Sequence, residues 1–206
     1  MKKVLIAEML NSDPEDYYNE SKGVYSNIPV FPLLNEQQIR EAISTSIDSE
    51  KYLKEIERLE EQGRLTQVRD SNYQICLVNW TECPQMIQLL TIMREWAFRN
   101  EGGGVGSNDY DSFDELEKMM QLIILDPDST EIIGSIVGGY RYMIHDYDSY
   151  PTGPVGAHFE FSEDWRNQLW IELGRSFINP YFQLKNQRKS FDLVLHGLGY
   201  IYANNI

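Results

Sequence analysis

A carboxylate and a guanidinium stand three residues apart in a run that reads WIELGRSFINPYF (Trp170–Phe182). The apolar residues around Glu172 and Arg175 predict a strand, and Asn179–Pro180 predicts where it breaks. Glu172 could act as a general base, while Arg175 could order or bind a carboxylate. Because residues three apart point to opposite faces of a regular strand, a direct pair would need a bulge. We therefore expect both residues to belong to a site. Structural pairing is the alternative for Glu172, and solvated surface charge is the alternative for Arg175.

The elements that would position these residues alternate between strand and helix from residue 73 onward. Thr81 is a plausible N-cap for the helix, with Pro84 in its first turn. A turn of Asp, Pro and Ser residues joins two of the strands into a hairpin. The predicted elements are a strand at Tyr73–Val78, a helix from Pro84 to Phe98, strands at Met119–Leu125, Glu131–Met143, Phe159–Ser162 and Trp170–Ile178, and a closing helix from Asn186 to Asn204.

The first 70 residues differ in texture from the rest of the chain. In Asn35–Gln62 the apolar residues recur mostly at steps of three and four, and Gly63 provides a stop signal. This pattern predicts a helix whose apolar stripe is a packing face. We accordingly divide the 206 residues into a mainly helical N-terminal extension (residues 1–70) and a main domain (residues 71–206).

Composition and charge exclude several classes of function. A net charge of −14 argues against nucleic acid as a partner. No apolar run approaches the roughly 20 residues of a membrane helix, and no signal peptide is recognisable, so we expect a cytoplasmic protein. Cys76 and Cys83 lack metal-ligand spacing, and the three histidines show no triad or metal pattern, so we expect structural roles for them. The glycine-rich loop at residues 102–106 follows a helix rather than a strand, which favours a flexible connector over a phosphate cradle.

Two phrases of the main domain carry a resemblance to a known family. They are VGGYR (Val137–Arg141) and ELGRS (Glu172–Ser176), the second followed by an Asn-Pro turn. With the order of the elements, they resemble the Gcn5-related N-acetyltransferase (GNAT) superfamily. Within it, the chain is most similar to the hemolysin-like N-acyltransferases that make ornithine and glycine lipids, which are related to the acyl-homoserine-lactone synthases. The resemblance covers residues 73–206.

The resemblance implies an α/β fold in which helices flank a mixed, mostly antiparallel sheet. It also implies transfer of a fatty acyl group, of the 3-hydroxyacyl type, from acyl carrier protein to the amine of an amino acid. Glu172 would be the base, and Arg175 would organise the site through Asp111 or Asp114. Backbone N–H groups at a bulge after Arg175 could bind the oxyanion. Substrate-binding roles are implied for Arg94, Phe98, Asp111, Asp114, Arg141 and Ser176, with solvated charge as the alternative for Arg141.

The choice of acyl donor follows from the segment after the ELGRS strand. Coenzyme-A-dependent members of the fold hold pyrophosphate with a glycine-containing turn, whereas Gln183–Arg188 contains no glycine. Residues 165–206 carry five basic and two acidic residues, a local balance of +3. We therefore expect Lys185, Arg188 and Lys189 to meet acyl carrier protein, whose phosphopantetheine thioester would be the donor in place of acyl-coenzyme A; a solvated helix end is the alternative. No tightly bound cofactor and no metal are expected. Peripheral membrane association would come through the lipid product.

Two other functions stay open at this point. One is autoinducer synthesis from S-adenosylmethionine, although the glycine-rich loop stands where the lactone synthases carry a Trp. The other is a GNAT-like interaction module without catalysis, with Asn35–Gln62 as its contact surface. The fold of the family continues beyond a helix like the one predicted to close this chain. We therefore expect a fragment of a longer protein, with a truncated version that lacks part of its acyl-binding cleft as the alternative.

Overall fold

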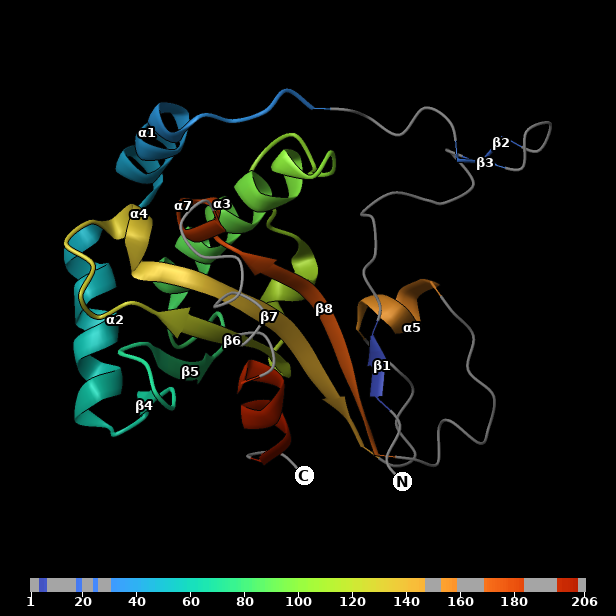
Figure 1. Ribbon diagram of the computed structural model, residues 1–206. Coiled ribbons are helices and arrows are strands. Elements are labelled where there is room, and N and C mark those ends of the chain that lie inside the picture. Colours follow the sequence, from blue (N-terminus) through green and yellow to red (C-terminus); the bar gives the residue numbers. More distant parts are fainter. Residues whose placement is uncertain are drawn as a thin grey trace.

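A six-stranded sheet forms the centre of the protein in its computed structural model, which describes residues 4–6, 18–19, 24–25, 31–146, 153–158, 169–183 and 196–203 (Figure 1). The strand order is β1-β8-β7-β6-β5-β4. All neighbours are antiparallel except β1 and β8, which run parallel. The strands are β1 (Val4–Ile6), β4 (Thr66–Gln67), β5 (Gln74–Val78), β6 (Met119–Leu125), β7 (Ile136–His145) and β8 (Trp170–Ile178), beside a separate pair β2 (Tyr18–Asn19) and β3 (Val24–Tyr25). The predicted fold class, a mostly antiparallel sheet flanked by helices, is confirmed.

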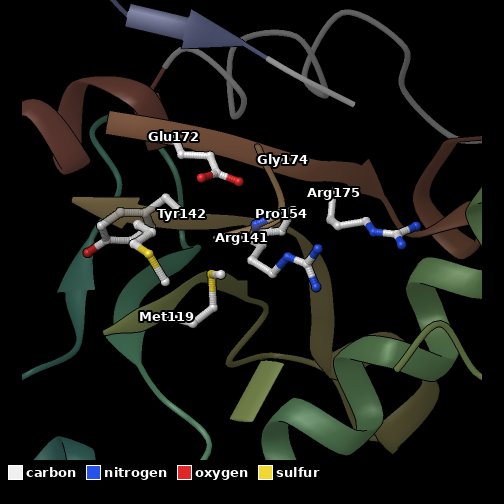
Figure 2. A pocket seen from close by; sticks show the side chains of 8 residues that line it. Met119, Arg141, Tyr142, Pro154, Glu172, Gly174 and Arg175 are labelled. Carbon is white, nitrogen blue, oxygen red and sulfur yellow. The ribbon is translucent and has the colours of Figure 1, made fainter. Parts of the chain in front are cut away.

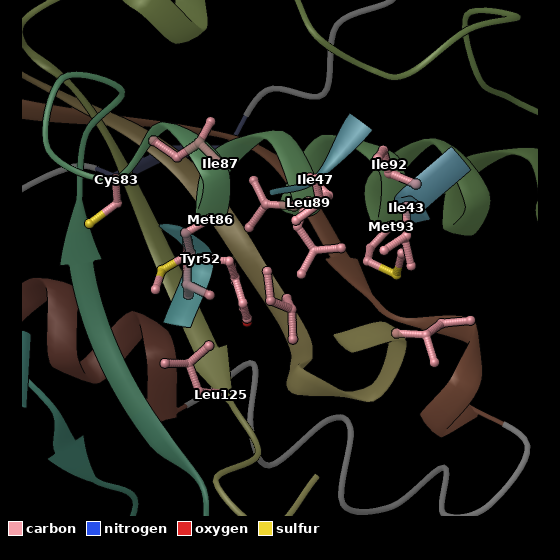
Figure 3. Packing of buried hydrophobic residues seen from close by; sticks show 14 of the residues in the cluster. Ile43, Ile47, Tyr52, Cys83, Met86, Ile87, Leu89, Ile92, Met93 and Leu125 are labelled. Atoms are coloured by element: carbon pink, nitrogen blue, oxygen red, sulfur yellow. The ribbon is translucent and has the colours of Figure 1, made fainter. Parts of the chain in front are cut away.

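Helices cover both faces of the sheet. On one face α1 (Glu36–Ser46), α2 (Ser49–Glu61) and α3 (Pro84–Asn100) share a hydrophobic cluster with β6 residues such as Leu125 (Figure 3). The other face packs on the helix at residues 196–203, where Ile201 contributes to a second cluster. Alternate side chains of β6 enter the two clusters, as the two-residue period of a strand requires. This explains why β6 is apolar almost throughout.

The single helix predicted over Asn35–Gln62 is in fact two helices. The chain leaves α1 at Ile47, and Asp48 caps α2 by accepting a hydrogen bond from the Lys51 amide at 3.2 Å. An Asp followed by helix formers is a typical N-cap signal, and the regular apolar spacing concealed it. The predicted packing face is confirmed, because its isoleucines lie in the same cluster as α3. The domain boundary at residue 70 stays a prediction.

The N-terminus of α3 is capped by another helix and not by Thr81, so that prediction is wrong. Cys83 occupies the N-cap position without a side-chain hydrogen bond. Instead, the buried Glu55 of α2 accepts hydrogen bonds from the amides of Gln85 and Met86, at 3.0 and 2.8 Å. The Glu55 carboxylate accepts hydrogen bonds from N–H groups that have no partner within the helix. Its negative charge is also stabilised by the positive end of the helix dipole.

Replacing Glu55 with Ala is expected to lower the free energy of unfolding by about 1–2 kcal/mol, because the amides of Gln85 and Met86 lose their acceptor. Urea denaturation followed by circular dichroism measures this change. Glu57→Ala is the matched control, since Glu57 lies on the same helix and is exposed. Equal stability of the two variants would show that Glu55 does not cap α3.

Three further differences concern the C-terminal half. The strand predicted over Glu131–Met143 begins only at Ile136, because α4 (Ile132–Ser135) precedes it. The loop after β7 contains α5 (Pro154–His158), and β8 is followed by α7 (Pro180–Gln183). The residues after Asp111, including Asp114, form a short 3-10 helix, η2 (Ser112–Glu115). The strand predicted at residues 159–162 and most of the closing helix lie outside the described residues. No described helix is both long and apolar enough to cross a membrane.

Candidate active site

A bulge in β8 sets the directions of the two residues that first indicated a site. Gly139 of β7 pairs with Phe177, but Arg141 pairs with Gly174. Arg175 and Ser176 of β8 therefore together lie opposite Tyr140 of β7. Arg175 has a φ of 54°, a left-handed conformation that is rare for a side chain other than glycine. The bulge turns Arg175 onto the face of the sheet that carries Glu172 and α3. Figure 2 shows Glu172 and Arg175 along β8, with Gly174 between them.

Three arginines and three aspartates meet beside this bulge and form what we call the Arg–Asp cluster. It brings together residues from α3, η2 and its approach, β7 and β8. Its members are Arg94, Arg141, Arg175, Asp109, Asp111 and Asp114. All are buried except Asp111, which is partly exposed, and their formal charges cancel.

The Arg–Asp cluster contains ion pairs from every one of its arginines. Arg94 contacts Asp109 and lies 2.9 Å from Asp114. Arg141 places Nη1 2.7 Å from Oδ1 of Asp111 and 3.3 Å from Oδ1 of Asp114. Arg175 places Nη1 2.9 Å from Oδ1 of Asp109 and Nη2 3.4 Å from Oδ2 of Asp111. The contacts to the Asp109 side chain are close in distance but lack hydrogen-bond alignment, so they act mainly as charge pairs.

Burial and pairing compete in setting the pKa values of the Arg–Asp cluster. Burial alone would raise the pKa of Asp114, yet the charges of Arg94 and Arg141 hold it below its usual value. At Asp109 burial prevails over the arginines and raises the pKa. Burial, together with repulsion from Arg94 and Arg141, lowers the pKa of Arg175 against the attraction of Asp109. The cluster is thus a tightly balanced set of buried charges that fixes one wall of the site.

Glu172 has a separate set of partners. Its Oε2 lies 3.0 Å from Nε2 of His145, and its Oε1 accepts a hydrogen bond from the Val155 amide at 2.9 Å. A Cβ atom added to Gly153 would lie only 2.5 Å from Oε2, so this glycine permits the close approach. The Glu172 side chain is only 6% exposed. Its carboxylate is therefore held in one orientation by groups from β7 and α5.

A narrow pocket separates Glu172 from the Arg–Asp cluster (Figure 2). Arg141 and Arg175 belong to both the cluster and the pocket wall. Glu172 stands on the other side of Gly174, and side chains from the two neighbouring strands and α5 complete the lining. The lining residues are Met119, Arg141, Tyr142, Met143, Pro154, Glu172, Gly174 and Arg175. The carboxylate and the two guanidinium groups thus face one space of about 10 Å³, which is room for about one water molecule.

The structure describes only some of the remaining predicted site residues. The Cζ atom of Arg175 lies 5.9 Å from the centroid of the Phe98 ring. Ser176 is half-buried in the bulge. The three predicted carrier-binding residues, Lys185, Arg188 and Lys189, lie outside the described residues. Within the part of the chain that the structure describes, no group of three or more His, Cys, Asp or Glu side chains could hold a metal ion.

The glycine-rich loop, expected as a flexible connector, is tied to α3. The buried Glu95 accepts hydrogen bonds from the amides of Val105 and Gly106, both at 2.9 Å, and pairs with Arg99 at 2.6 Å. Gly104 has a φ of 93°, and a Cβ there would lie 2.7 Å from Cγ of Arg99. These two amides of the loop are thus engaged by a carboxylate, which leaves neither for a phosphate.

Sequence reasoning missed three residues of the site. Asp109 lies two residues before the predicted Asp111, and Gln121 donates to Asp114 at 2.8 Å. His145 stands four residues after Arg141 on β7, a spacing that places both on one face of a strand. This alternation was a usable signal for His145, whereas nothing near Gln121 distinguishes it from an ordinary strand residue.

Comparison with known proteins finds matches over part of the chain. Residues 93–191 match the family described as Acetyltransferase (GNAT) domain. The chain is 35% identical over 135 residues to a glycine N(alpha)-acyltransferase of Bacteroides thetaiotaomicron, covering 61% of this chain and 39% of that protein. It is 33% identical over 135 residues to a glycine N(alpha)-acyltransferase of Phocaeicola vulgatus, covering 61% and 40%. The chain thus spans about two fifths of the length of these curated relatives. No solved structure matches it significantly.

These matches bear on the fold. The matched region runs from α3 through β8 and contains every member of the Arg–Asp cluster together with Glu172. The hemolysin-like subgroup and the relation to lactone synthases stay predictions. The mostly antiparallel sheet flanked by helices agrees with a GNAT-like fold, and residues 93–191 are similar to a GNAT domain.

Proposed function

We propose that this protein transfers a fatty acyl group from a thioester to the amino group of an amino acid, with glycine as the acceptor. The observation that carries the proposal is the buried Glu172 carboxylate, held on the wall of a pocket that Arg141 and Arg175 also line. A base and guanidinium donors are what an amino acid requires, since its amine must lose a proton and its carboxylate needs hydrogen-bond donors. The curated relatives support glycine, because both are named for acylation of that amino acid.

The chemistry of the step assigns a task to each side of the pocket. The amine nitrogen attacks the thioester carbonyl carbon, the C–S bond breaks, and the carrier leaves as a thiolate that takes up a proton from solvent. Glu172 takes the proton that the amine must lose, directly or through one water, and such a base contributes about 10²- to 10⁴-fold. Arg141 and Arg175 orient the carboxylate of the acceptor, and Asp111 and Asp114 hold Arg141 in place. The Arg–Asp cluster therefore acts by pre-organisation.

The proposed donor is the phosphopantetheine thioester of an acyl carrier protein that bears a 3-hydroxyacyl chain. Support comes from the sequence between residues 183 and 189. It lacks the glycine of a pyrophosphate-binding turn but contains Lys185, Arg188 and Lys189, which suit an acidic carrier. On this proposal the reaction takes place in the cytoplasm, and its lipid product draws the protein to the membrane surface.

An assay with defined donors and acceptors tests the proposal. The protein at its full natural length is incubated with acyl carrier protein or coenzyme A thioesters and with glycine, ornithine or S-adenosylmethionine, and products are identified by mass spectrometry. We expect acylglycine from the carrier thioester, with less product from coenzyme A. Acylated ornithine in place of acylglycine would correct the acceptor, and a homoserine lactone would establish the autoinducer alternative. The absence of any acylated amine would refute the proposed function.

A further inference from the structure

We propose that His145 is a positioning residue for Glu172, an inference that rests on the proposed function. His145 is the last residue of β7 and is only 3% exposed. Its Nε2 lies 3.0 Å from Oε2 of Glu172, a residue 27 positions away in the chain. The two therefore form a buried pair that only the β7–β8 pairing creates.

The strand register explains how the pair arises. Met143 lies opposite Glu172, and His145 lies opposite Trp170. The four side chains share one face of the two strands, and His145 reaches Glu172 along the diagonal between them. The His145 ring also stacks on Trp170, with centroids 3.9 Å apart and an angle of 13° between the planes. Trp170 thus fixes the plane of the imidazole, and Nε2 consequently meets the carboxylate.

The carboxylate of Glu172 is held at both oxygens. Val155 donates its amide to Oε1, and His145 contacts Oε2. Gly153 closes the space beside Oε2, where even a Cβ atom would be too close. Each carboxylate oxygen can accept two hydrogen bonds, so a contact from each side leaves acceptor capacity on both oxygens. Loss of the His145 contact would release Oε2 and let the carboxylate rotate away from the pocket.

A purely structural histidine would behave differently from a positioning one. The stacking on Trp170 needs only a flat ring, and Phe provides it, whereas the contact to Oε2 needs the ring nitrogen. His145→Phe therefore preserves the packing and removes the positioning contact. His145→Gln loses the ring but offers an amide that can meet Oε2. The pair of variants separates the two roles without relying on a change that empties the core.

The test compares steady-state kinetics of the full-length protein with glycine as the varied substrate. We expect His145→Phe to lower kcat about 100-fold with little change in KM for glycine, because misplacing a catalytic group costs about that factor. His145→Gln should restore at least a tenth of the wild-type kcat. His196→Gln, at an exposed histidine on the helix at residues 196–203, should match the wild type.

A double variant shows whether His145 acts through Glu172. If it does, His145→Phe should slow the Glu172→Gln protein no further, since residues that act as one unit are not additive. A wild-type kcat in folded His145→Phe, or additive losses in the double variant, would overturn the inference alone. If His145→Phe does not fold, His145→Gln is used in its place. A rise in KM for glycine without a fall in kcat in that variant would overturn the inference. A wild type that acylates no amine would overturn the proposed function and this inference together.

Discussion

Replacing Glu172 with Gln is expected to lower the rate of amine acylation by about 10²- to 10⁴-fold, the range that a general base contributes. Gln matches the shape of Glu, and its Oε1 can still accept the hydrogen bond from the Val155 amide. It cannot, however, take a proton from the amine. The fall should be in kcat, with KM for glycine changed less, because the pocket wall formed by Arg141 and Arg175 remains. Steady-state kinetics with acyl carrier thioester and glycine measure both constants.

The control for this variant is a glutamate with no place in the pocket. Glu117 is exposed on the segment before β6, and Glu117→Gln makes the same chemical change. Thermal unfolding should show both variants folded. If Glu172→Gln retains the wild-type kcat while folded, the base lies elsewhere in the site. A matching loss in Glu117→Gln would point to a general effect of charge on the acidic protein and its carrier.

The second large effect is expected on stability. Asp114→Asn should lower the free energy of unfolding by about 3–5 kcal/mol, the cost of leaving a buried charge without its counter-charge. Asp114 is fully buried and contacts both Arg94 and Arg141, so its loss leaves three arginines facing two aspartates. Urea denaturation gives the change, and Asp128→Asn, at an exposed position, provides the control. A loss below about 1 kcal/mol would show that the remaining aspartates compensate.

The stabilities of the wild type and of Asp114→Asn should depend differently on pH. Because the arginines hold the pKa of Asp114 below its usual value against the effect of burial, the folded state binds this proton less readily than the unfolded state. The stability that Asp114 contributes is therefore fully present above the ordinary Asp pKa of about 4 and is lost as the pH falls below it. The difference in unfolding free energy between wild type and Asp114→Asn should shrink on acidification. A constant difference down to strongly acidic pH would contradict this account.

Local patterns were sufficient for much of the fold. Alternation and apolar runs predicted β5, β6 and β8, and Pro84 predicted the first turn of α3, because these signals depend only on neighbours in the chain. The errors lie where a distant group replaces a local one. Glu55 caps α3 from another helix, so the Thr81 signal had no bearing on it. Regular apolar spacing likewise concealed the break at Asp48, since both helices present their stripes to the same core.

The same distinction between local signals and distant contacts applies to the site. The sequence by itself determined the residue types, the strand that carries Glu172 and Arg175, and the need for a bulge if both were to face one side. Only the tertiary structure decided that the bulge occurs, that Arg175 turns to Asp109 and Asp111, and that Glu172 meets His145. The physical reason is that strand register and bulge position arise from pairing between β7 and β8, whose contacting residues lie tens of positions apart. No spacing within either strand contains that information.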